Sequence, residues 1–246
     1  MISNNEIKKI RSLNQKKFRD NLGLFIVEGE KMVDELKKSN YEIESLYYKD
    51  EIGEEAMRKI TNLHSPSPVL SVVKKNGNEI LSTEDGLKVL SKNGLYLFLD
   101  KISDPGNLGT IIRVAEWFGI DAIFASMDTV ELYNPKVVQA TMGAIFRVNF
   151  HNTDVLNLLK AAKAGGACIY GTFLDGNNIY KADLNTGKEK PSIIVIGNEA
   201  EGVSKSIENI VSDKLYIPPY PINSPGSESL NAAIATAITL AEFRRR

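Results

Sequence analysis

Three polar segments carry the side chains of this chain that could do chemistry. The first follows an apolar run and contains Asn107 and Arg113. Asn107 is placed to open a helix, and Gly109 lies one helical turn before Arg113, which leaves room beside the guanidinium for a bulky ligand. Spacing alone favours a plainer interpretation, in which Asn107 caps the helix and Arg113 pairs with Glu116 or lies on Trp117.

A second segment, residues 196–204, lies between an apolar run and a helical pattern. Gly197 and Gly202 permit close approach of the backbone to a ligand, and Glu199 stands between them. The alternative is an ordinary strand-to-helix turn with exposed acids, since glycine turns are common.

The third segment, residues 217–231, is rich in proline and ends in Ser229, Leu230 and Asn231. Ser229 is the expected N-cap of a terminal helix over residues 229–243. That helix carries several alanines, so its backbone can come close to another element. An ordinary buried terminal helix would show the same pattern.

The apolar pattern around these segments predicts the fold that must position them. Continuous apolar strands alternate with helical patterns, which indicates a parallel sheet covered by helices on both faces. Ligands of such sheets gather at the C-terminal ends of the strands, where all three segments lie. The expected strands are 95–100, 121–125, 168–173, 192–198 and 214–218, and the expected helices are 107–118, 135–143, 154–164, 203–211 and 229–243.

The first part of the chain predicts a smaller α/β unit of its own, with denser charge runs. A polar, turn-rich stretch places the boundary near residues 82–94, so the expected domains are 1–90 and 94–246. The expected strands of the first domain are 25–29, 41–48 and 68–73, with helices over 30–39 and 53–62 and a basic helix near the N-terminus.

The composition excludes several classes of protein. The chain has 246 residues, of which 43% are hydrophobic and 25% charged, as in an ordinary globular protein. The single cysteine, Cys168, excludes an internal disulfide and fits the cytoplasm, and two histidines are too few for a structural zinc site. We expect no metal, no membrane span and no signal peptide. Neither glycine-rich fingerprint of the dinucleotide- and ATP-binding enzymes is present.

A basic cluster near the N-terminus stands out against the net charge of −1. Residues 1–19 hold six basic residues and one acidic residue, a balance of +5. On one continuous helix Lys8, Arg11 and Arg19 would form a stripe. A solvated amphipathic face is the common outcome for such a helix. Because the charge is concentrated against the global balance, we favour a surface that follows the phosphates of a nucleic acid.

In combination, the three segments have a specific order. D-P-x-N-x-G-x-x-x-R, then I-G-N-E-x-x-G, then I-P…S-L-N-x-A resemble the three motifs of the SpoU (TrmH-like) RNA ribose 2′-O-methyltransferases of the SPOUT superfamily. The resemblance runs from residue 95 to the C-terminus. The stretch from residue 7 to the Phe25-Ile26-Val27-Glu28-Gly29 run resembles, less specifically, the RNA-binding substrate domain of that family, which is of ribosomal-protein type.

This resemblance implies a parallel α/β sheet with a C-terminal trefoil knot, a homodimer packed through the C-terminal domain, and S-adenosylmethionine as cofactor. Its RNA partner would be ribosomal RNA in preference to transfer RNA. The implied catalytic residues are Asn107, Arg113, Glu199, Ser229 and Asn231. The implied cofactor-binding residues are Thr172, Phe173, Gly197, Asn198, Gly202, Ile217, Pro218 and Leu230. One departure is the stretch between Pro218 and Ser229, which is longer than in most of the family.

The implied reaction is methyl transfer to a ribose 2′-hydroxyl. We expect Arg113 to hold an RNA phosphate, since a guanidinium is a poor base in its usual protonated state. Asn107 and Asn231 would orient the ribose, and Glu199 would order Asn107 or Arg113. Two other interpretations stay open: a non-catalytic RNA-binding protein that keeps the fold, and a methyltransferase with a substrate other than RNA. The joint presence of Asn107, Arg113, Glu199 and Asn231 argues against loss of catalysis.

Overall fold

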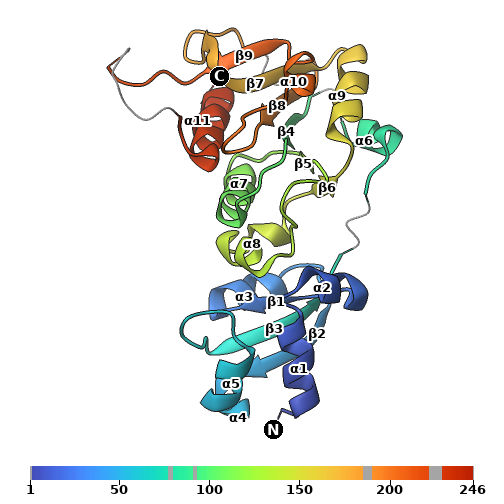
Figure 1. Cartoon of the computed structure of the whole chain (residues 1–246), viewed down its shortest axis with the longest axis vertical. Helices are drawn as coiled ribbons and strands as arrows, with labels where there is room; N and C mark the ends of the chain where they lie inside the picture. The colour runs from blue at the N-terminus through green and yellow to red at the C-terminus, as the bar shows by residue number, and fades with distance from the viewer. Residues whose placement is uncertain (1, 77–79, 91–92, 185–189, 222–228, 246) are drawn as a thin grey trace. The chain divides into compact units, whose positions relative to one another are not determined.

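A computed structural model describes residues 2–76, 80–90, 93–184, 190–221 and 229–245 (Figure 1). It divides into two compact units. Unit 1 contains Met1–Gly77 and Glu131–Arg147, and unit 2 contains Asn78–Val130 and Val148–Arg246. The sequence pattern did not indicate that residues 131–147, which lie between two strands of unit 2, pack into unit 1.

Unit 1 is built on a three-stranded antiparallel sheet in the order β1-β3-β2. Its strands are β1 (Leu24–Glu28), β2 (Ile43–Tyr48) and β3 (Val69–Lys74), and its helices are α1 (Asn4–Ser12), α2 (Lys16–Leu22), α3 (Glu30–Lys37), α4 (Lys49–Ile52), α5 (Glu54–Ile60) and α8 (Pro135–Ala140), followed by a 3₁₀ turn, Ala144–Phe146. Apolar side chains of α1 and α5 meet those of β1 and β3 in a buried core that includes Ile10, Leu13 and Met57. Helices α1 and α5 thus cover one face of this sheet, and β1 is buried at all five of its residues.

The inserted segment 131–147 forms an aromatic cluster with β1 and Tyr41 in unit 1. The buried ring of Tyr133 lies 4.6 Å from the ring of Phe25 on β1. Tyr41 reaches Phe146 at 5.3 Å between ring centroids and Phe25 at 5.9 Å. Arg147 pairs with Glu35 of α3. Aromatic burial and one ion pair therefore tie the insertion to β1 and α3.

The N-terminal basic stripe predicted from the sequence is wrong in one residue. Helix α1 ends at Ser12, and α2 starts anew at Lys16, so Arg19 is not on the same helical face as Lys8 and Arg11. Arg19 is only 2% exposed. Its guanidinium donates to both carboxylate oxygens of Glu131 and, at 2.8 Å, to the carbonyl oxygen of Leu13. A buried, paired guanidinium cannot contact RNA.

Unit 2 contains a six-stranded sheet in the order β6-β5-β4-β8-β7-β9. All neighbouring strands pair in parallel, as the apolar pattern predicted. Its strands are β4 (Leu95–Leu99), β5 (Ala122–Ala125), β6 (Phe150–Asn152), β7 (Cys168–Asn178), β8 (Ser192–Ile196) and β9 (Asp213–Tyr216), and its helices are α6 (Thr83–Val89), α7 (Pro105–Trp117), α9 (Val155–Ala164), α10 (Lys205–Glu208) and α11 (Ala232–Arg245). The short strand β6 and helix α6 were not predicted. The trefoil knot stays a prediction.

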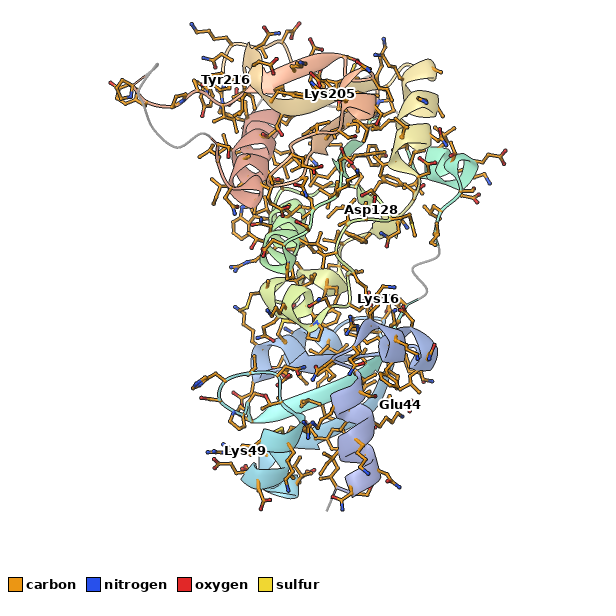
Figure 2. The ribbon with its side chains drawn as sticks, in the orientation of Figure 1. Lys16, Glu44, Lys49, Asp128, Lys205 and Tyr216 are labelled. Atoms are coloured by element: carbon orange, nitrogen blue, oxygen red, sulfur yellow. The ribbon has the colours of Figure 1, made fainter. Side chains whose placement is uncertain are left out.

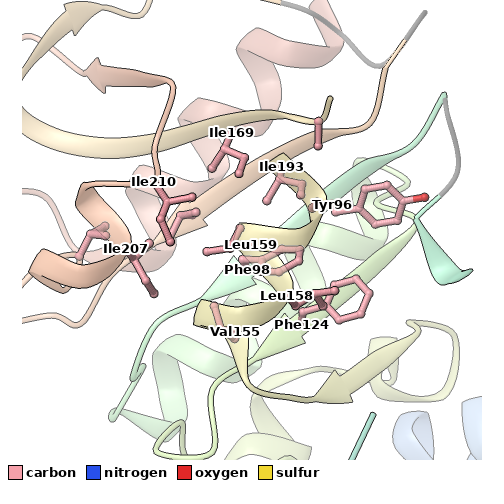
Figure 3. Close-up of a cluster of buried hydrophobic side chains, with 14 of the residues drawn as sticks. Tyr96, Phe98, Phe124, Val155, Leu158, Leu159, Ile169, Ile193, Ile207 and Ile210 are labelled. Carbon is pink, nitrogen blue, oxygen red and sulfur yellow. The ribbon is translucent and has the colours of Figure 1, made fainter. Parts of the chain in front are cut away.

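Helices cover both faces of this sheet. On one face, Leu158 and Leu159 of α9 point toward Phe98 and Phe124 of the central strands (Figure 3). On the other face, Phe243 of α11 packs edge-on against Tyr170 of β7, with 5.1 Å between ring centroids. This two-sided burial explains why the central strands read as continuous apolar runs. None of the helices in the described ranges has the length and apolar character needed to span a membrane.

Candidate active site

Parallel pairing of β4 with β8 brings the first two polar segments together. Leu99 pairs with Ile196, and the backbone N–H of Asp100 donates to the Ile196 carbonyl oxygen at 2.9 Å. The residues that follow the two strands therefore leave the sheet side by side. The Asp100 carboxylate accepts from the backbone N–H of Ser204 at 2.7 Å, which holds the far end of the second segment to the first.

A chain of side-chain hydrogen bonds joins all three segments. Asn107 donates from Nδ2 to Oε1 of Glu199 at 3.0 Å, and Asn231 donates from Nδ2 to Oδ1 of Asn107 at 2.7 Å. A carboxylate can only accept, so the amide orientation of Asn107 is fixed by Glu199. Asn107 then fixes the amide of Asn231. Ser229 lies two residues away, is exposed, and lines the neighbouring pocket.

Glu199 is the end of this chain and is held by four hydrogen bonds. Besides Asn107, it accepts from the backbone N–H and the hydroxyl of Ser103 at 3.1 and 2.9 Å, and from the backbone N–H of Asp104 at 3.1 Å. Burial raises the pKa of the Glu199 carboxyl, but the hydrogen bonds from Asn107 and the 103–104 backbone outweigh burial and lower the pKa below its ordinary value. Glu199 is therefore an ionised anchor whose oxygens are already occupied.

The turn that carries Glu199 needs glycine at its first position. A Cβ on Gly197 would lie 2.2 Å from the backbone carbon of Gly202. The backbone groups of Asn198 and Gly202 exchange hydrogen bonds of 3.0 and 2.9 Å across the turn. The Asn198 side chain donates to the Lys101 carbonyl at 2.8 Å and accepts from the backbone N–H groups of Ala200 and Glu201. These contacts make the Asn198 side chain a brace of the turn.

Two helix caps differ from the predicted ones. Asp104, not Asn107, caps α7, because its carboxylate accepts from the Asn107 backbone N–H at 2.7 Å. Asn231, not Ser229, occupies the start of α11, where its Oδ1 accepts from the backbone N–H groups of Ala233 and Ile234 at 2.9 and 3.3 Å. Because Asp104 caps the helix, the Asn107 side-chain amide is free of capping and makes the contacts with Glu199 and Asn231. These contacts orient the amide beside the candidate ligand site.

Arg113 lies on the exposed side of α7. Its guanidinium makes no hydrogen bond or ion pair with another residue of the described ranges, so the predicted pairing with Glu116 is absent there. No contact joins it to the chain of Asn231, Asn107 and Glu199. Its guanidinium is therefore accessible to a ligand that approaches from solvent.

A pocket of about 720 Å³ opens beside this hydrogen-bonded chain in unit 2. Of the predicted cofactor residues, Pro218 does not line it; those that do are Thr172, Phe173, Gly197, Asn198, Gly202, Ile217 and Leu230. The predicted cofactor loop continues through residues 222–228, which lie outside the described residues. The cofactor loops expected from the sequence, 172–174, 197–202 and 217–230, also contain the lining residues Leu174, Ala200, Glu201 and Ser229. The lining residues outside these loops, which sequence reasoning missed, are Asp175, Ile196, Val203, Ser204, Lys205, Glu208, Leu215, Tyr216, Ala232 and Ala235.

Several missed residues form a charged network at the pocket wall. Lys214 donates to Glu208 at 2.5 Å and to Asp175 at 3.3 Å, and its ammonium lies 4.8 Å from the ring centroid of Phe173. Hydrogen bonds from Lys205 and Lys214 lower the pKa of Glu208 to about 2. Lys205, from α10, and Tyr216, from the end of β9, are labelled in Figure 2. One sequence signal for Asp175 was available: it lies just after Phe173, where the predicted strand 168–173 ends and where ligands of a parallel sheet gather.

The pocket suits a nucleoside-sized ligand with a charged end. Its volume lies in the range of roughly 300–1,000 Å³ typical of small-molecule sites. Apolar side chains of Phe173, Ile217 and Leu230 can cover a flat base, while the turn at Gly197 presents backbone to the ligand at close range. Glu199 adds a negative charge that suits a sulfonium cation. The residues present therefore fit S-adenosylmethionine.

Comparison with known proteins agrees with this geometry. Residues 94–241 match the model of the SpoU rRNA Methylase family, and residues 4–90 match that of the MRM3-like substrate binding domain. The 23S rRNA (guanosine(2553)-2′-O)-methyltransferase RlmP of Bacillus subtilis is 28% identical, over 98% of this chain and 96% of its own length.

Two solved structures extend the likeness over the whole chain. A TrmH-family RNA methyltransferase from Porphyromonas gingivalis is 34% identical, with a TM-score of 0.85 over 100% of this chain and 99% of its own. An AdoMet-bound rRNA methyltransferase from Sinorhizobium meliloti is 29% identical, with a TM-score of 0.84 over 100% and 96%. With a matched family model over most of its length and these full-length relatives, this chain belongs to the SpoU rRNA methylase family.

Proposed function

We propose that this protein transfers the methyl group of S-adenosylmethionine to the 2′-hydroxyl of a ribose in ribosomal RNA. The observation that carries this proposal is the chain of Asn231, Asn107 and Glu199, which ties all three family motifs together beside the pocket. A large-subunit RNA is the favoured substrate, since the full-length relative from Bacillus subtilis is named for methylation of 23S rRNA.

Bound S-adenosylmethionine supplies an activated methyl group, so the protein mainly has to position and deprotonate the ribose hydroxyl. Asn107 is the orienting group, because its Nδ2 and Oδ1 each keep one hydrogen-bonding position beyond those used by Glu199 and Asn231. Glu199 is a positioning residue and not the base, since its oxygens already accept four hydrogen bonds. Arg113 holds an RNA phosphate and stabilises the developing alkoxide.

A methyl-transfer assay distinguishes this function from the non-catalytic alternative. Purified protein is incubated with methyl-labelled S-adenosylmethionine and ribosomal RNA that lacks 2′-O-methylation, and the label is mapped. We expect methyl transfer by the parent, and loss of transfer with retained cofactor affinity in Arg113→Ala. Lys160→Ala removes an exposed cation of α9 in the same unit and serves as the matched control. Cofactor binding by the parent without transfer to any RNA would favour the scaffold interpretation.

We propose that the chain has two functional domains, residues 1–90 and residues 94–246. We also propose that RNA docks on unit 1. Lys8 and Arg11 are exposed on one face of α1, and their side chains make no hydrogen bond or ion pair to another described residue. Charge reversal at both is expected to weaken RNA binding and flatten its dependence on salt, with cofactor binding intact. Reversal at Lys31 and Lys160 is the control for total charge. If both double variants bind alike, RNA follows another path.

We further propose that the protein acts as a homodimer through unit 2, in the cytoplasm. Trp117 of α7 is 82% exposed and Ile234 of α11 is 50% exposed, and a second copy of unit 2 could cover these apolar side chains. Sedimentation equilibrium on the parent and on Trp117→Glu tests this. A monomeric parent at micromolar concentration would contradict the dimer.

A further inference from the structure

The second residue after β4, Lys101, has a backbone conformation that residues with a side chain disfavour. Lys101 has φ of 60°, in the left-handed region that glycine adopts freely and other residues rarely adopt. Its backbone is held from both sides: the N–H donates to Oγ of Ser126 at 2.9 Å, and the carbonyl oxygen accepts from Nδ2 of Asn198 at 2.8 Å. The surrounding loops therefore impose this conformation, and they make no use of the lysine side chain.

The Lys101 side chain is exposed and has no hydrogen-bond or ion-pair partner among the described residues. Its position is nevertheless set by the candidate active site. Its carbonyl is bound by the residue next to Glu199, and it stands two residues before Ser103, which donates twice to Glu199. A rigid backbone thus presents a mobile cation at the edge of the hydrogen-bonded chain.

The local charge explains what such a cation could do. This end of the sheet carries acidic groups at Asp104, Asp128, Glu199 and Glu201, all on loops around the ends of β4, β5 and β8. An RNA ribose brings a phosphate on each side, and each phosphate is repelled by these carboxylates. Arg113 is one cation that can offset this repulsion, and Lys101 is a second, on the loop before α7.

We propose that the Lys101 ammonium binds a phosphate of the substrate RNA next to the target ribose. This inference rests on the proposed function and adds a substrate-binding residue to it. A lysine suits the role because it binds phosphate as a point charge on a flexible stem, without the fixed geometry of a guanidinium. The strained backbone is then the consequence of keeping a cation where glycine would fit the loop better.

The experiment compares Lys101→Gly, Lys101→Arg and Met142→Gly. Met142 is the other non-glycine residue of the described chain with positive φ, 51°, and it lies in unit 1, so its substitution controls for relief of backbone strain alone. For each protein we measure the thermal midpoint, the dissociation constant for S-adenosylmethionine, and the dissociation constant for ribosomal RNA over a series of salt concentrations.

Lys101→Gly is expected to keep or raise the thermal midpoint and to keep cofactor affinity, while RNA affinity falls several-fold. The slope of log K against log salt should fall by about 0.7–0.9, the value for one lost phosphate contact. Lys101→Arg should restore most of the RNA affinity, and Met142→Gly should match the parent in all RNA measurements.

Two outcomes would overturn the proposal. One is Lys101→Gly with the RNA affinity and salt slope of the parent, and the other is a lowered thermal midpoint with loss of cofactor binding, which would make Lys101 a structural residue. The RNA measurement does not depend on turnover. A parent that binds RNA without methylating it would refute the proposed function, while the salt slope would still decide whether Lys101 contacts a phosphate.

Discussion

Replacing Glu199 with glutamine tests the central element of the site. The change keeps the shape of the side chain and replaces one of its acceptor oxygens with an NH₂ donor. The oxygen facing Asn107 must stay an acceptor, because the Asn107 amide cannot turn without opposing Asn231. The new NH₂ group therefore faces Ser103, whose hydroxyl can rotate to accept but whose backbone N–H cannot.

The magnitude follows from this count. One hydrogen bond to a charged acceptor is lost, and the others become neutral bonds. Hydrogen bonds to charged groups contribute roughly 1.5–3 kcal/mol and neutral ones about 1 kcal/mol. Because the site is partly open to solvent, we expect the low end of the total, a loss of about 3 kcal/mol in the free energy of unfolding. The donor–donor conflict at the Ser103 N–H should shift the substituted side chain and, with it, the Asn107 amide that it positions, which should lower kcat roughly 100-fold.

Urea unfolding of the parent and of Glu199→Gln measures this difference, with Glu201→Gln as control. Glu201 is exposed in the same turn, and its substitution should change stability by less than about 0.5 kcal/mol. The folded-state pKa of Glu199 lies below the ordinary 4.5, so its stabilising effect is complete above that value and is lost as pH falls through the folded-state pKa. The two stabilities should converge in acid.

Two results would refute this reasoning. A stability difference below about 0.5 kcal/mol at pH 7 would mean that the four hydrogen bonds to Glu199 are dispensable. A difference that persists unchanged into acid would mean that the charge of Glu199 has no part in it. Either would leave Asn107 positioned by its helix alone.

Three further predictions follow from particular contacts. Gly197→Ala places a Cβ against backbone and should weaken binding of S-adenosylmethionine at least tenfold by calorimetry; unchanged affinity would contradict a rigid turn. Arg19→Met leaves Glu131 half-paired with Lys75 at 3.6 Å and should lower the free energy of unfolding by roughly 3 kcal/mol in urea, and a loss below 1 kcal/mol would refute it. Burial lowers the pKa of His151, so stability should fall as pH drops below its ordinary 6.5, and His151→Asn should remove that part of the decline.

Much of the catalytic unit follows from the sequence alone. Continuous apolar strands separated by helical patterns specify a parallel sheet, because only strands buried on both faces lack alternation. Parallel strands end on the same edge, so the segments after 95–100 and 192–198 were expected at one edge of the sheet. Their contact depends on the pairing of β4 with β8, which the sequence did not predict. The family motifs then named the side chains that would meet there, and Asn107, Glu199 and Asn231 do form one hydrogen-bonded chain.

Tertiary structure decided the rest, for a reason that recurs in each case. Asp104 and Asn107 are both good N-caps, and only the carboxylate of Glu199, 92 residues away, recruits the Asn107 amide. The local sequence predicts that Arg19 is a surface cation. In the structure Arg19 is buried and paired with Glu131, 112 residues away. Helical periodicity and charge patterns report what lies within a few turns of a residue. An ion-pair or hydrogen-bond partner from a distant segment changes the free energy of burying a polar side chain by several kcal/mol. No local sequence pattern contains that information.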